Sequence, residues 1–203
     1  MANTRDDAEL RPQPAGAKLE LRRRALAARD ALPGAERARL SARVCARAAA
    51  LPELVGAATI MLYASFRSEV ETMALFAWAL EAGKTVCTPR ILAPRLMAAY
   101  RVTDPETDLV PGSWGIPEPH EGLEEVPPER MDVVVVPGAA FDLAGRRCGY
   151  GGGFYDTYLA RTRPGTPWVA LAFEAQLVDE LLCEPHDLAV SAVVTETRVI
   201  RTR

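Results

Sequence analysis

Two stretches near the start of the chain carry apolar residues at helical spacing. The first covers residues 18–31 and stops at a Pro-Gly pair at 33–34, and the second covers residues 35–50. Recurrence of apolar side chains every three or four residues is typical of a helix with one buried face. The pattern therefore predicts two consecutive amphipathic helices. The first of them carries Lys18 and Arg22 one turn apart, so these two cations can act together.

Beyond residue 50, strand-like and helix-like segments alternate. We expect strands at residues 59–63, 84–88, 96–102, 132–136, 168–173 and 192–195, and helices at 72–81, from 154 onward and near 176–182. The segment Pro111–Pro119 contains too much Pro and Gly for regular structure. Alternation of strands with helices is typical of the α/β class. We expect a single domain with a central, largely parallel twisted sheet flanked by helices.

The composition is that of an ordinary globular protein. The 203 residues suffice for one domain, and 49% of them are hydrophobic and 25% charged. Residues 1–16 are polar and contain Pro, so we expect a disordered extension there and a folded domain over 17–203. No apolar run approaches the ~20 residues of a membrane span. We interpret the chain as a monomeric, cytoplasmic protein without a membrane partner.

Cysteine usage and charge narrow the chemistry. The four cysteines stand far apart and the chain has two histidines, which argues against a zinc site and for free thiols. The net charge is −3, but residues 1–50 hold eleven Lys or Arg against six Asp or Glu. This basic part could meet phosphate, or it could be the solvated face of two surface helices. No aromatic residue stands among its arginines, so we expect no nucleic-acid partner.

The most informative segment is Pro137–Leu159, with the sequence PGAAFDLAGRRCGYGGGFYDTYL. It follows an apolar strand, is rich in glycine, and contains Arg146, Arg147 and, at an expected helix start, Asp156. Glycines let backbone N–H groups approach a ligand closely, and arginines supply fixed positive charge. A carboxylate such as that of Asp156 can hold Mg²⁺. The segment predicts a site for nucleotide phosphates, although a merely flexible loop would also be rich in glycine.

Two common phosphate motifs do not account for this segment. It lacks G-x-x-x-x-G-K-[ST], and in Gly83-Lys84-Thr85 the position of the first glycine is occupied by Trp78. That tripeptide is better interpreted as a helix end followed by a strand. The segment also lacks G-x-G-x-x-G with an acidic residue about 20 positions later. Ligands of parallel sheets lie at the carboxyl ends of strands. We therefore expect three strand-end loops to converge at that edge, namely 65–70, 137–153 and 173–176.

The motif R-x-G-Y-G-G-G-[FY]-Y-D after an apolar strand resembles the signature of the 5-formyltetrahydrofolate cyclo-ligase family. Other segments are similar to that family in order and spacing: Lys18-x-x-x-Arg22, Tyr63–Val70, Trp114-Gly115-Ile116 with Glu118-Pro119, Leu171–Leu177 and Glu184–Asp187. The similarity spans about residues 18 to 200. The glycine signature is specific, and the other segments support it.

The resemblance implies an ATP-dependent closure of 5-formyltetrahydrofolate to 5,10-methenyltetrahydrofolate, with ADP and phosphate released. The formyl oxygen is a poor leaving group, so N10 of the folate cannot expel it unaided. In the mechanism that the resemblance implies, the γ-phosphoryl group of ATP moves to that oxygen, and N10 then attacks the activated carbon. Such a transfer depends on positioning and on neutralising charge more than on a protein nucleophile. The implied cofactors are ATP and Mg²⁺.

The resemblance also implies roles for particular residues. ATP would be bound by Lys18, Arg22, Arg147, Cys148, Gly149, Tyr150, Gly151, Gly152, Gly153, Phe154 and Tyr155. The folate substrate would be bound by Phe66, Glu69, Trp114, Tyr150, Gly151, Gly152, Gly153 and Phe154, with Glu69 accepting hydrogen bonds from the pterin ring. Arg147 and Tyr155 would be catalytic, no catalytic base is assigned, and Asp156 and Asp187 would hold Mg²⁺.

Each role has a plainer structural alternative. The two N-terminal cations could be solvated helix charges, Glu69 an ordinary loop carboxylate and Trp114 an aromatic residue at the edge of the core. Asp156 could cap its helix, and Asp187 could be a turn residue. The sequence alone leaves these alternatives open.

Two residues depart from the family pattern, because Cys148 replaces the usual Leu and Phe154 replaces a common Tyr. The missing hydroxyl at 154 bears on substrate contacts there. Two other functions also remain open. One is an ATP-binding relative that acts on a different formylated or amide substrate. The other is a non-catalytic module that binds nucleotide or RNA, for which binding would survive loss of Arg147 and Asp156 but collapse with salt.

Overall fold

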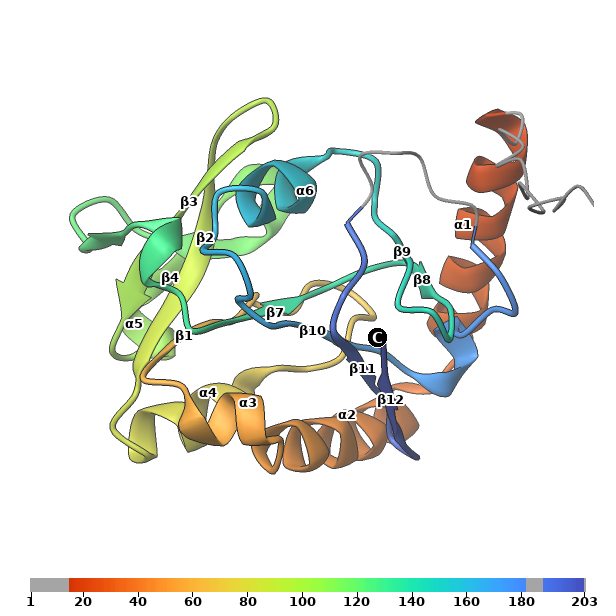
Figure 1. The fold of residues 1–203 in the computed structure, drawn as a ribbon, viewed down its shortest axis with the longest axis horizontal. Coiled ribbons are helices and arrows are strands. Elements are labelled where there is room, and N and C mark those ends of the chain that lie inside the picture. The colour runs from red at the N-terminus through yellow and green to blue at the C-terminus, as the bar shows by residue number, and fades with distance from the viewer. Residues whose placement is uncertain (1–14, 182–187, 203) are drawn as a thin grey trace, which may run out of the picture.

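The computed structural model describes residues 15–181 and 188–202. Their main feature is a sheet of eight strands (Figure 1). In spatial order the strands are β12 (Val199–Arg201), β11 (Ala192–Val194), β10 (Trp168–Leu171), β7 (Val133–Val136), β1 (Thr59–Met61), β2 (Thr85–Ala93), β3 (Leu96–Val102) and β6 (Glu125–Val126). The five strands from β11 to β2 pair in parallel, and the others pair antiparallel. The predicted α/β fold with a largely parallel sheet is confirmed.

Helices cover both faces of this sheet (Figure 1). On one side lie α2 (Gly34–Ala49), α3 (Pro52–Gly56) and α4 (Met73–Glu81), and on the other lies α6 (Phe154–Leu159). The first helix, α1 (Ala15–Asp30), stands beside a small hairpin of β8 (Ala140–Phe141) and β9 (Arg147–Cys148). A short helix, α5 (Pro105–Asp108), precedes a second hairpin of β4 (Leu109–Pro111) and β5 (Pro117–Pro119). None of the described helices is long and apolar enough to cross a bilayer.

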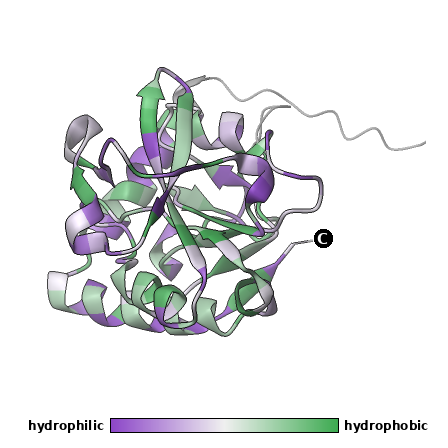
Figure 2. Ribbon diagram, turned by 90° about the vertical axis from the view of Figure 1, so that its left-hand side faces the viewer, coloured by the Kyte–Doolittle hydropathy of each residue, from purple (hydrophilic) through white to green (hydrophobic). Residues whose placement is uncertain are grey.

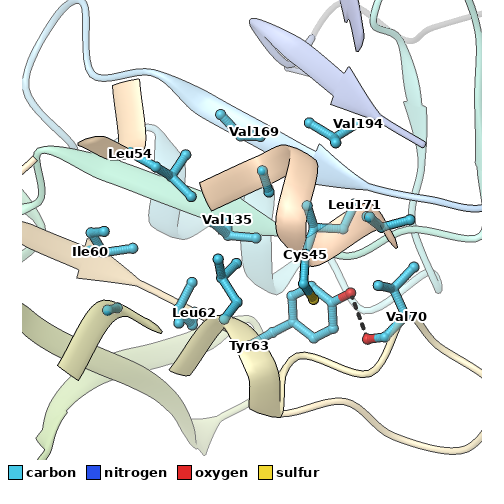
Figure 3. Packing of buried hydrophobic residues seen from close by; sticks show 14 of the residues in the cluster. Cys45, Leu54, Ile60, Leu62, Tyr63, Val70, Val135, Val169, Leu171 and Val194 are labelled. Carbon is cyan, nitrogen blue, oxygen red and sulfur yellow. Dashed lines mark hydrogen bonds between the residues drawn. The ribbon is translucent and has the colours of Figure 1, made fainter. Parts of the chain in front are cut away.

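Side chains of the central strands alternate between two cores. In β7, Val133 and Val135 join the cluster under α2–α4, whereas Val134 and Val136 join the cluster on the α6 side. Successive residues of a strand point to opposite faces, and a parallel sheet covered on both sides needs apolar residues at every position. The first cluster is drawn in Figure 3, where Val135 and its neighbours pack around Tyr63. The central strands accordingly appear as mostly hydrophobic in Figure 2.

The order of the parallel strands marks where a ligand can bind. In chain order they are β1, β2, β7, β10 and β11, and their spatial order is β2-β1-β7-β10-β11. The chain therefore leaves β1 first toward one edge of the sheet and later toward the other. At such a reversal the loops that follow the two neighbouring strands diverge and leave a crevice at their carboxyl ends. The fold places this crevice after β1 and β7, the strands that precede residues 65–70 and 137–153.

Two predictions of local structure are wrong. Pro111–Pro119 was expected to be irregular, but its ends form β4 and β5, in which Pro111 lies opposite Pro117. A two-stranded ribbon tolerates proline because each strand has an edge without ladder hydrogen bonds. The helix expected near 176–182 is also absent from the described part of that range. A 3-10 helix spans Glu174–Gln176 instead, and the following residues bridge to Phe141 in an extended conformation.

Other elements were missed or begin earlier than expected. The two-residue strands β8 and β9 and the edge strand β12 are too short to give a periodic pattern. Helix α1 begins at Ala15, so the last two residues of the expected extension 1–16 are helical. Residues 1–14 lie outside the described residues, so the disorder expected there stays a prediction.

Candidate active site

A cavity of about 800 Å³ opens at the carboxyl ends of β1 and β7, where the strand order reverses. Its walls come from α1, the loop after β1, the β2–β3 hairpin, the β4–β5 turn and residues 147–157. The volume lies toward the upper end of the range for small-molecule sites. Six basic and four acidic side chains line the cavity, although the whole chain carries a net charge of −3. A cleft lined by an excess of positive charge attracts anions.

The β8–β9 hairpin carries the chain into the glycine segment, and Asp142 fixes its turn. Its buried carboxylate accepts hydrogen bonds from the backbone N–H groups of Ala144, Arg146 and Leu181, each at 2.9 Å. The Arg146 guanidinium points to the same side, toward Asp142, Glu180 and the carbonyl of Leu181. The expectation that Arg146 charges the ligand site is therefore wrong. Arg146 directly precedes β9 and Arg147 is its first residue, and only the Arg147 side chain lines the cavity.

We call residues 149–153, Gly-Tyr-Gly-Gly-Gly, the glycine loop. Gly153 has φ of 69° and directly precedes α6, a left-handed conformation that favours glycine. At Gly152 an added Cβ would stand 2.6 Å from the ring of Phe154, so only glycine fits there without displacing that ring. Helix α1 holds the start of the loop, because Arg22 Nε donates to the carbonyl of Gly149 at 2.8 Å. Apart from the Tyr150 side chain, the loop thus presents only backbone to the cavity.

Arg147 lies under the glycine loop and is almost fully buried. Its Nη2 donates to Asp156 Oδ1 at 2.6 Å, and its guanidinium lies 5.8 Å from the centre of the Tyr155 ring. Its Nε is buried and has no hydrogen-bond partner among the described residues. A guanidinium has five N–H donors, so the bond to one carboxylate leaves donors for an anion. Burial, followed by the nearby charge of Glu69, raises the pKa of Tyr155, which therefore remains a neutral phenol.

Glu69 lies on the opposite wall, in the loop after β1. One carboxylate oxygen accepts from the backbone N–H of Phe66 at 2.9 Å, and the other accepts from the Tyr150 hydroxyl at 2.5 Å. Burial raises the pKa of Glu69, and the hydrogen bond from Tyr150 and the charge of Arg29 act in the opposite direction. The carboxylate is thus held in a fixed plane beside the cavity. Each of its oxygens can accept a further hydrogen bond.

Aromatic residues form the rim. Trp114 is 70% exposed and meets Phe154 edge to face, with ring centroids 6.1 Å apart. Phe66 also lines the cavity, with the Arg67 guanidinium 5.0 Å from its ring centre. A tryptophan this exposed adds little to the core, and large exposed apolar groups commonly mark a binding surface. The cavity therefore combines a cationic glycine-rich wall with a wall of aromatic rings and one carboxylate.

Comparisons with known proteins agree with this geometry. The sequence pattern of the 5-formyltetrahydrofolate cyclo-ligase family matches residues 14–196. The chain belongs to that family. It is 34% identical over 182 residues to the 5-formyltetrahydrofolate cyclo-ligase of Escherichia coli K12, covering 84% of this chain and 96% of that one. It is 33% identical over 193 residues to the Mus musculus 5-formyltetrahydrofolate cyclo-ligase, covering 89% and 92%.

A solved structure supports the same assignment. The NMR structure of the 5,10-methenyltetrahydrofolate synthetase of Aquifex aeolicus superposes with a TM-score of 0.81 at 38% identity, covering 92% of this chain and 93% of that chain. These findings confirm the predicted family and its enzyme class, an ATP-dependent ligase of folate one-carbon metabolism.

Most residues that the resemblance to the cyclo-ligases singled out meet in the one cavity. Those that line it are Lys18, Arg22, Phe66, Glu69, Trp114, Arg147, Gly149, Tyr150, Gly151, Gly152, Gly153, Phe154, Tyr155 and Asp156. Cys148 does not line it, because its side chain packs with Ala25, Ala140 and Leu181 beneath the loop. Any nucleotide contact at Cys148 would come from its backbone. The predicted metal ligand Asp187 lies outside the described residues. Of the three loops expected to converge, 173–176 does not line the cavity, but Gln176 donates hydrogen bonds to the carbonyls of Gly138 and Ala139 and so supports the loop that does.

The structure adds three cavity cations that sequence reasoning did not select, namely Arg29, Arg67 and Arg95. Arg29 follows Lys18 and Arg22 on the same helical face, so its periodicity was a usable signal. Arg95 lies in the turn between β2 and β3, and its side chain lies against Gly153. Nothing in the local sequence indicates that this turn reaches the glycine loop. Only the tertiary arrangement brings the two together.

Proposed function

We propose that this protein closes 5-formyltetrahydrofolate to 5,10-methenyltetrahydrofolate at the expense of ATP, releasing ADP and phosphate. One observation carries the proposal: a single cavity at the strand reversal joins a cationic glycine-rich wall to an aromatic wall with one carboxylate. The first wall suits a triphosphate and the second suits a flat heterocycle with N–H donors. Family membership supports the reaction, and the geometry of the cavity supports a separate half for each reactant.

The nucleotide would lie on the wall formed by α1 and the glycine loop. Lys18 and Arg22 would bind phosphate oxygens from one side and Arg147 from the other, with backbone N–H groups of the loop between them. Arginine suits this task because its planar fork can donate two parallel hydrogen bonds to a phosphate. Arg147 is the cation expected to act at the reacting phosphoryl group. Its buried Nε, which lacks a partner among the described residues, supports this role.

The donor set also fits a magnesium ion. Asp156 lines the cavity, and Arg147 engages only its Oδ1. In the part of the chain that the structure describes, no three His, Cys, Asp or Glu side chains gather as ligands of a metal would. That agrees with Mg²⁺ rather than with a protein-caged metal, because Mg²⁺ is commonly held by one or two carboxylates together with substrate phosphates. Asp156 would hold the ion beside the phosphates, where its positive charge would offset theirs.

The folate would lie on the opposite wall. Glu69 would accept hydrogen bonds from the N–H donors of the pterin ring, which requires the ionised carboxylate. Phe66, Trp114 and Phe154 would pack against the ring system, and Tyr155 would lie between the two reactants. In this arrangement the formyl group faces the nucleotide wall. The protein's contribution is then to align two bound molecules and to surround their reacting groups with positive charge.

The reaction balances without a protein nucleophile. The formyl oxygen bonds to the γ-phosphorus as the bond to ADP breaks, which turns that oxygen into part of a good leaving group. The N10 lone pair attacks the formyl carbon, the N10 proton goes to solvent, and the carbon–oxygen bond breaks to release phosphate. Arg147 would offset the charge of the phosphoryl group throughout.

The test is product formation by the purified protein with 5-formyltetrahydrofolate and Mg·ATP, read from the absorbance of the methenyl product. We expect product only when ATP is present, and a large loss in Asp156→Asn, with Arg24→Gln as an exposed control from α1. Binding of ATP without any product would contradict the proposal and favour another formylated substrate. The predicted monomer and cytoplasmic location stay predictions, and the elution volume of the same preparation tests the first.

A further inference from the structure

Three separate parts of the cavity wall meet at one buried arginine. Arg29 of α1 is only 4% exposed. Its Nε donates to Ser68 Oγ at 3.0 Å, and its Nη1 donates to Tyr150 Oη at 2.7 Å. Ser68 adjoins Glu69 in the loop after β1, whereas Tyr150 belongs to the glycine loop. One guanidinium therefore ties the first helix to both the nucleotide wall and the folate wall.

The direction of every hydrogen bond in this group is fixed by Arg29. A guanidinium has no acceptor, so both hydroxyl oxygens must accept from it, and each hydroxyl then has one proton to donate. Tyr150 donates that proton to Glu69 at 2.5 Å, since its other acceptor, the carbonyl of Gly138, is 3.4 Å away. Ser68 donates to the carboxylate of Asp30. Two parallel chains result, from Arg29 through a hydroxyl to a carboxylate.

The first chain sets the state of Glu69. Tyr150 occupies one carboxylate oxygen and the backbone N–H of Phe66 occupies the other, so the plane of the carboxylate is fixed. Burial raises the pKa of Glu69, while the Tyr150 hydrogen bond and the Arg29 charge oppose that rise. Without Arg29, the Tyr150 hydroxyl is free to rotate away. The buried carboxylate then loses two of the three influences that oppose the rise of its pKa and keeps only the hydrogen bond from the backbone of Phe66.

The same contact anchors the glycine loop. Tyr150 supplies the only side chain beyond a hydrogen atom among residues 149–153. Its hydroxyl and the bond from Arg22 to the carbonyl of Gly149 fasten the loop to α1. A ligand that orders the loop also places Tyr150 against Glu69, and a ligand that orders Glu69 offers Tyr150 its acceptor. The first ligand to bind therefore bears the entropic cost of ordering both the loop and Glu69, and the second ligand binds to groups that are already ordered.

We propose that Arg29 is a positioning residue that couples the two reactants: through Tyr150 it links the loop that binds nucleotide to the carboxylate that binds folate, so each reactant tightens the binding of the other. The inference rests on the proposed function, since it needs both reactants in this cavity. Coupling between two sites is reciprocal, so either reactant can serve as the titrant.

The experiment is calorimetric titration of the full chain with the β,γ-imido analogue of ATP, with and without saturating 5-formyltetrahydrofolate. We expect folate to tighten binding of the analogue about tenfold in the unaltered protein. In Arg29→Gln and in Tyr150→Phe we expect the tightening to fall to about twofold or less, measured as the ratio of each variant's own affinities with and without folate. The double variant should lose nothing further, because both changes break one chain. The control is Arg24→Gln, which removes an exposed charge from the same helix and should keep the tenfold effect.

Two results would overturn the inference: independent binding in the unaltered protein, or full coupling in both Arg29→Gln and Tyr150→Phe. A purely structural Arg29 would lower the melting temperature and leave the coupling ratio unchanged. If Arg29→Gln does not fold, Tyr150→Phe decides, since it removes one hydroxyl from a side chain that is 45% exposed. Failure of 5-formyltetrahydrofolate to bind at all would refute the proposed function as well. Two reactants that bind without coupling would refute only the role of Arg29.

Discussion

The core of the sheet and the rim at its carboxyl ends differ in the kind of residue they bury, although β7 runs directly from one into the other. In the core, all four valines of β7 are fully buried and pack against apolar neighbours on both faces. At the rim, the chain that follows turns into glycines and buried charge, with Arg147 nearly inaccessible and its Nε lacking a partner among the described residues. Burial that stabilises the core costs free energy at the rim, because polar groups there lose water.

Backbone conformation divides the two regions in the same way. Within the described residues, three residues other than glycine have positive φ, namely Arg67 at 56°, Arg95 at 59° and Trp114 at 57°, and all three line the cavity. A side chain in this conformation is strained, at a cost of order 1–3 kcal/mol. In the described part of the chain, no core residue other than glycine has a positive φ. The core therefore provides the stability, and the rim uses part of it to hold charges and rings in place.

The sharpest way to test the division is to change two adjacent arginines. Arg147→Gln should lower kcat by about 10³ to 10⁵, about 4–7 kcal/mol, because a reacting phosphoryl group loses its cation. Steady-state rates with Mg·ATP and 5-formyltetrahydrofolate measure the effect.

The matched control is Arg146→Gln. Its guanidinium points away from the cavity, toward Asp142 and Glu180, so we expect kcat within about twofold and a loss of only about 1 kcal/mol in the free energy of unfolding. Equal losses of kcat in the two variants would contradict the assignment of Arg147 to the site.

The core should respond in the opposite sense. Phe76 of α4 is fully buried under the sheet, and Phe76→Ala should lower the free energy of unfolding by about 3–5 kcal/mol through lost contacts and a cavity. Urea denaturation measures this loss. At a temperature where the variant is folded, we expect KM for both reactants within about twofold of the unaltered protein. A change in KM as large as the change in stability would mean that core and rim are not separable.

Glu69→Gln should weaken folate binding selectively. The amide keeps the size of the side chain but loses the charge that accepts from N–H donors, so we expect KM for the folate to rise about 10- to 100-fold. The KM for ATP measured at saturating folate should change far less. An unchanged KM for folate would return Glu69 to the role of an ordinary loop carboxylate.

Trp114 offers a smaller test of the rim. Removing its exposed ring in Trp114→Ala should raise KM for the folate about 2- to 10-fold, the amount expected for one aromatic contact. Trp114→Gly should bind folate as weakly as Trp114→Ala and melt at a higher temperature, because alanine at this positive φ is strained and glycine is not. The reverse order of melting temperatures would show that the conformation at 114 carries no strain.

The pH dependence should carry the signature of Glu69. Burial raises the pKa of this carboxyl above its usual value, and in the proposed mode of binding the folate is held by the ionised form. The kcat/KM for the folate should therefore be level above that pKa, halve at it and fall about tenfold per pH unit below it. Rates are corrected for acid-promoted closure without enzyme. Glu69→Gln should lack this acidic limb, and a limb that persists unchanged must come from another group.

Regular periodicity accounts for what the sequence could predict of the fold. Apolar runs such as Val133–Val136 and the helical spacing in α1 and α2 are local signals, and they predicted both the elements and the α/β class. The strands of the β8–β9 hairpin have two residues each, so no period exists to detect. The helix expected near 176–182 failed because Gln176 turns its side chain to the carbonyls of Gly138 and Ala139. That contact depends on a partner far away in the chain.

The candidate site divides similarly. The glycine signature and its similarity to the cyclo-ligases selected Arg147, Glu69 and Trp114, which the structure brings to one cavity. The sequence could not show that Arg146 and Arg147 point apart, because that depends on where a two-residue strand begins, and here it begins at Arg147. Nor could it show that Arg29 and Glu69 share Tyr150, since these residues lie 121 and 81 positions from it. Tertiary contacts alone create that link.

The most direct measurement follows the formyl oxygen. In the proposed reaction the cavity aligns this oxygen with the γ-phosphorus, so that it leaves as part of the released phosphate. We would supply 5-formyltetrahydrofolate labelled with heavy oxygen in the formyl group and determine the label in the phosphate by mass spectrometry after one turnover. We expect one labelled oxygen in each phosphate formed with methenyl product. Label that appears only in water, with unlabelled phosphate, would contradict transfer to the formyl oxygen.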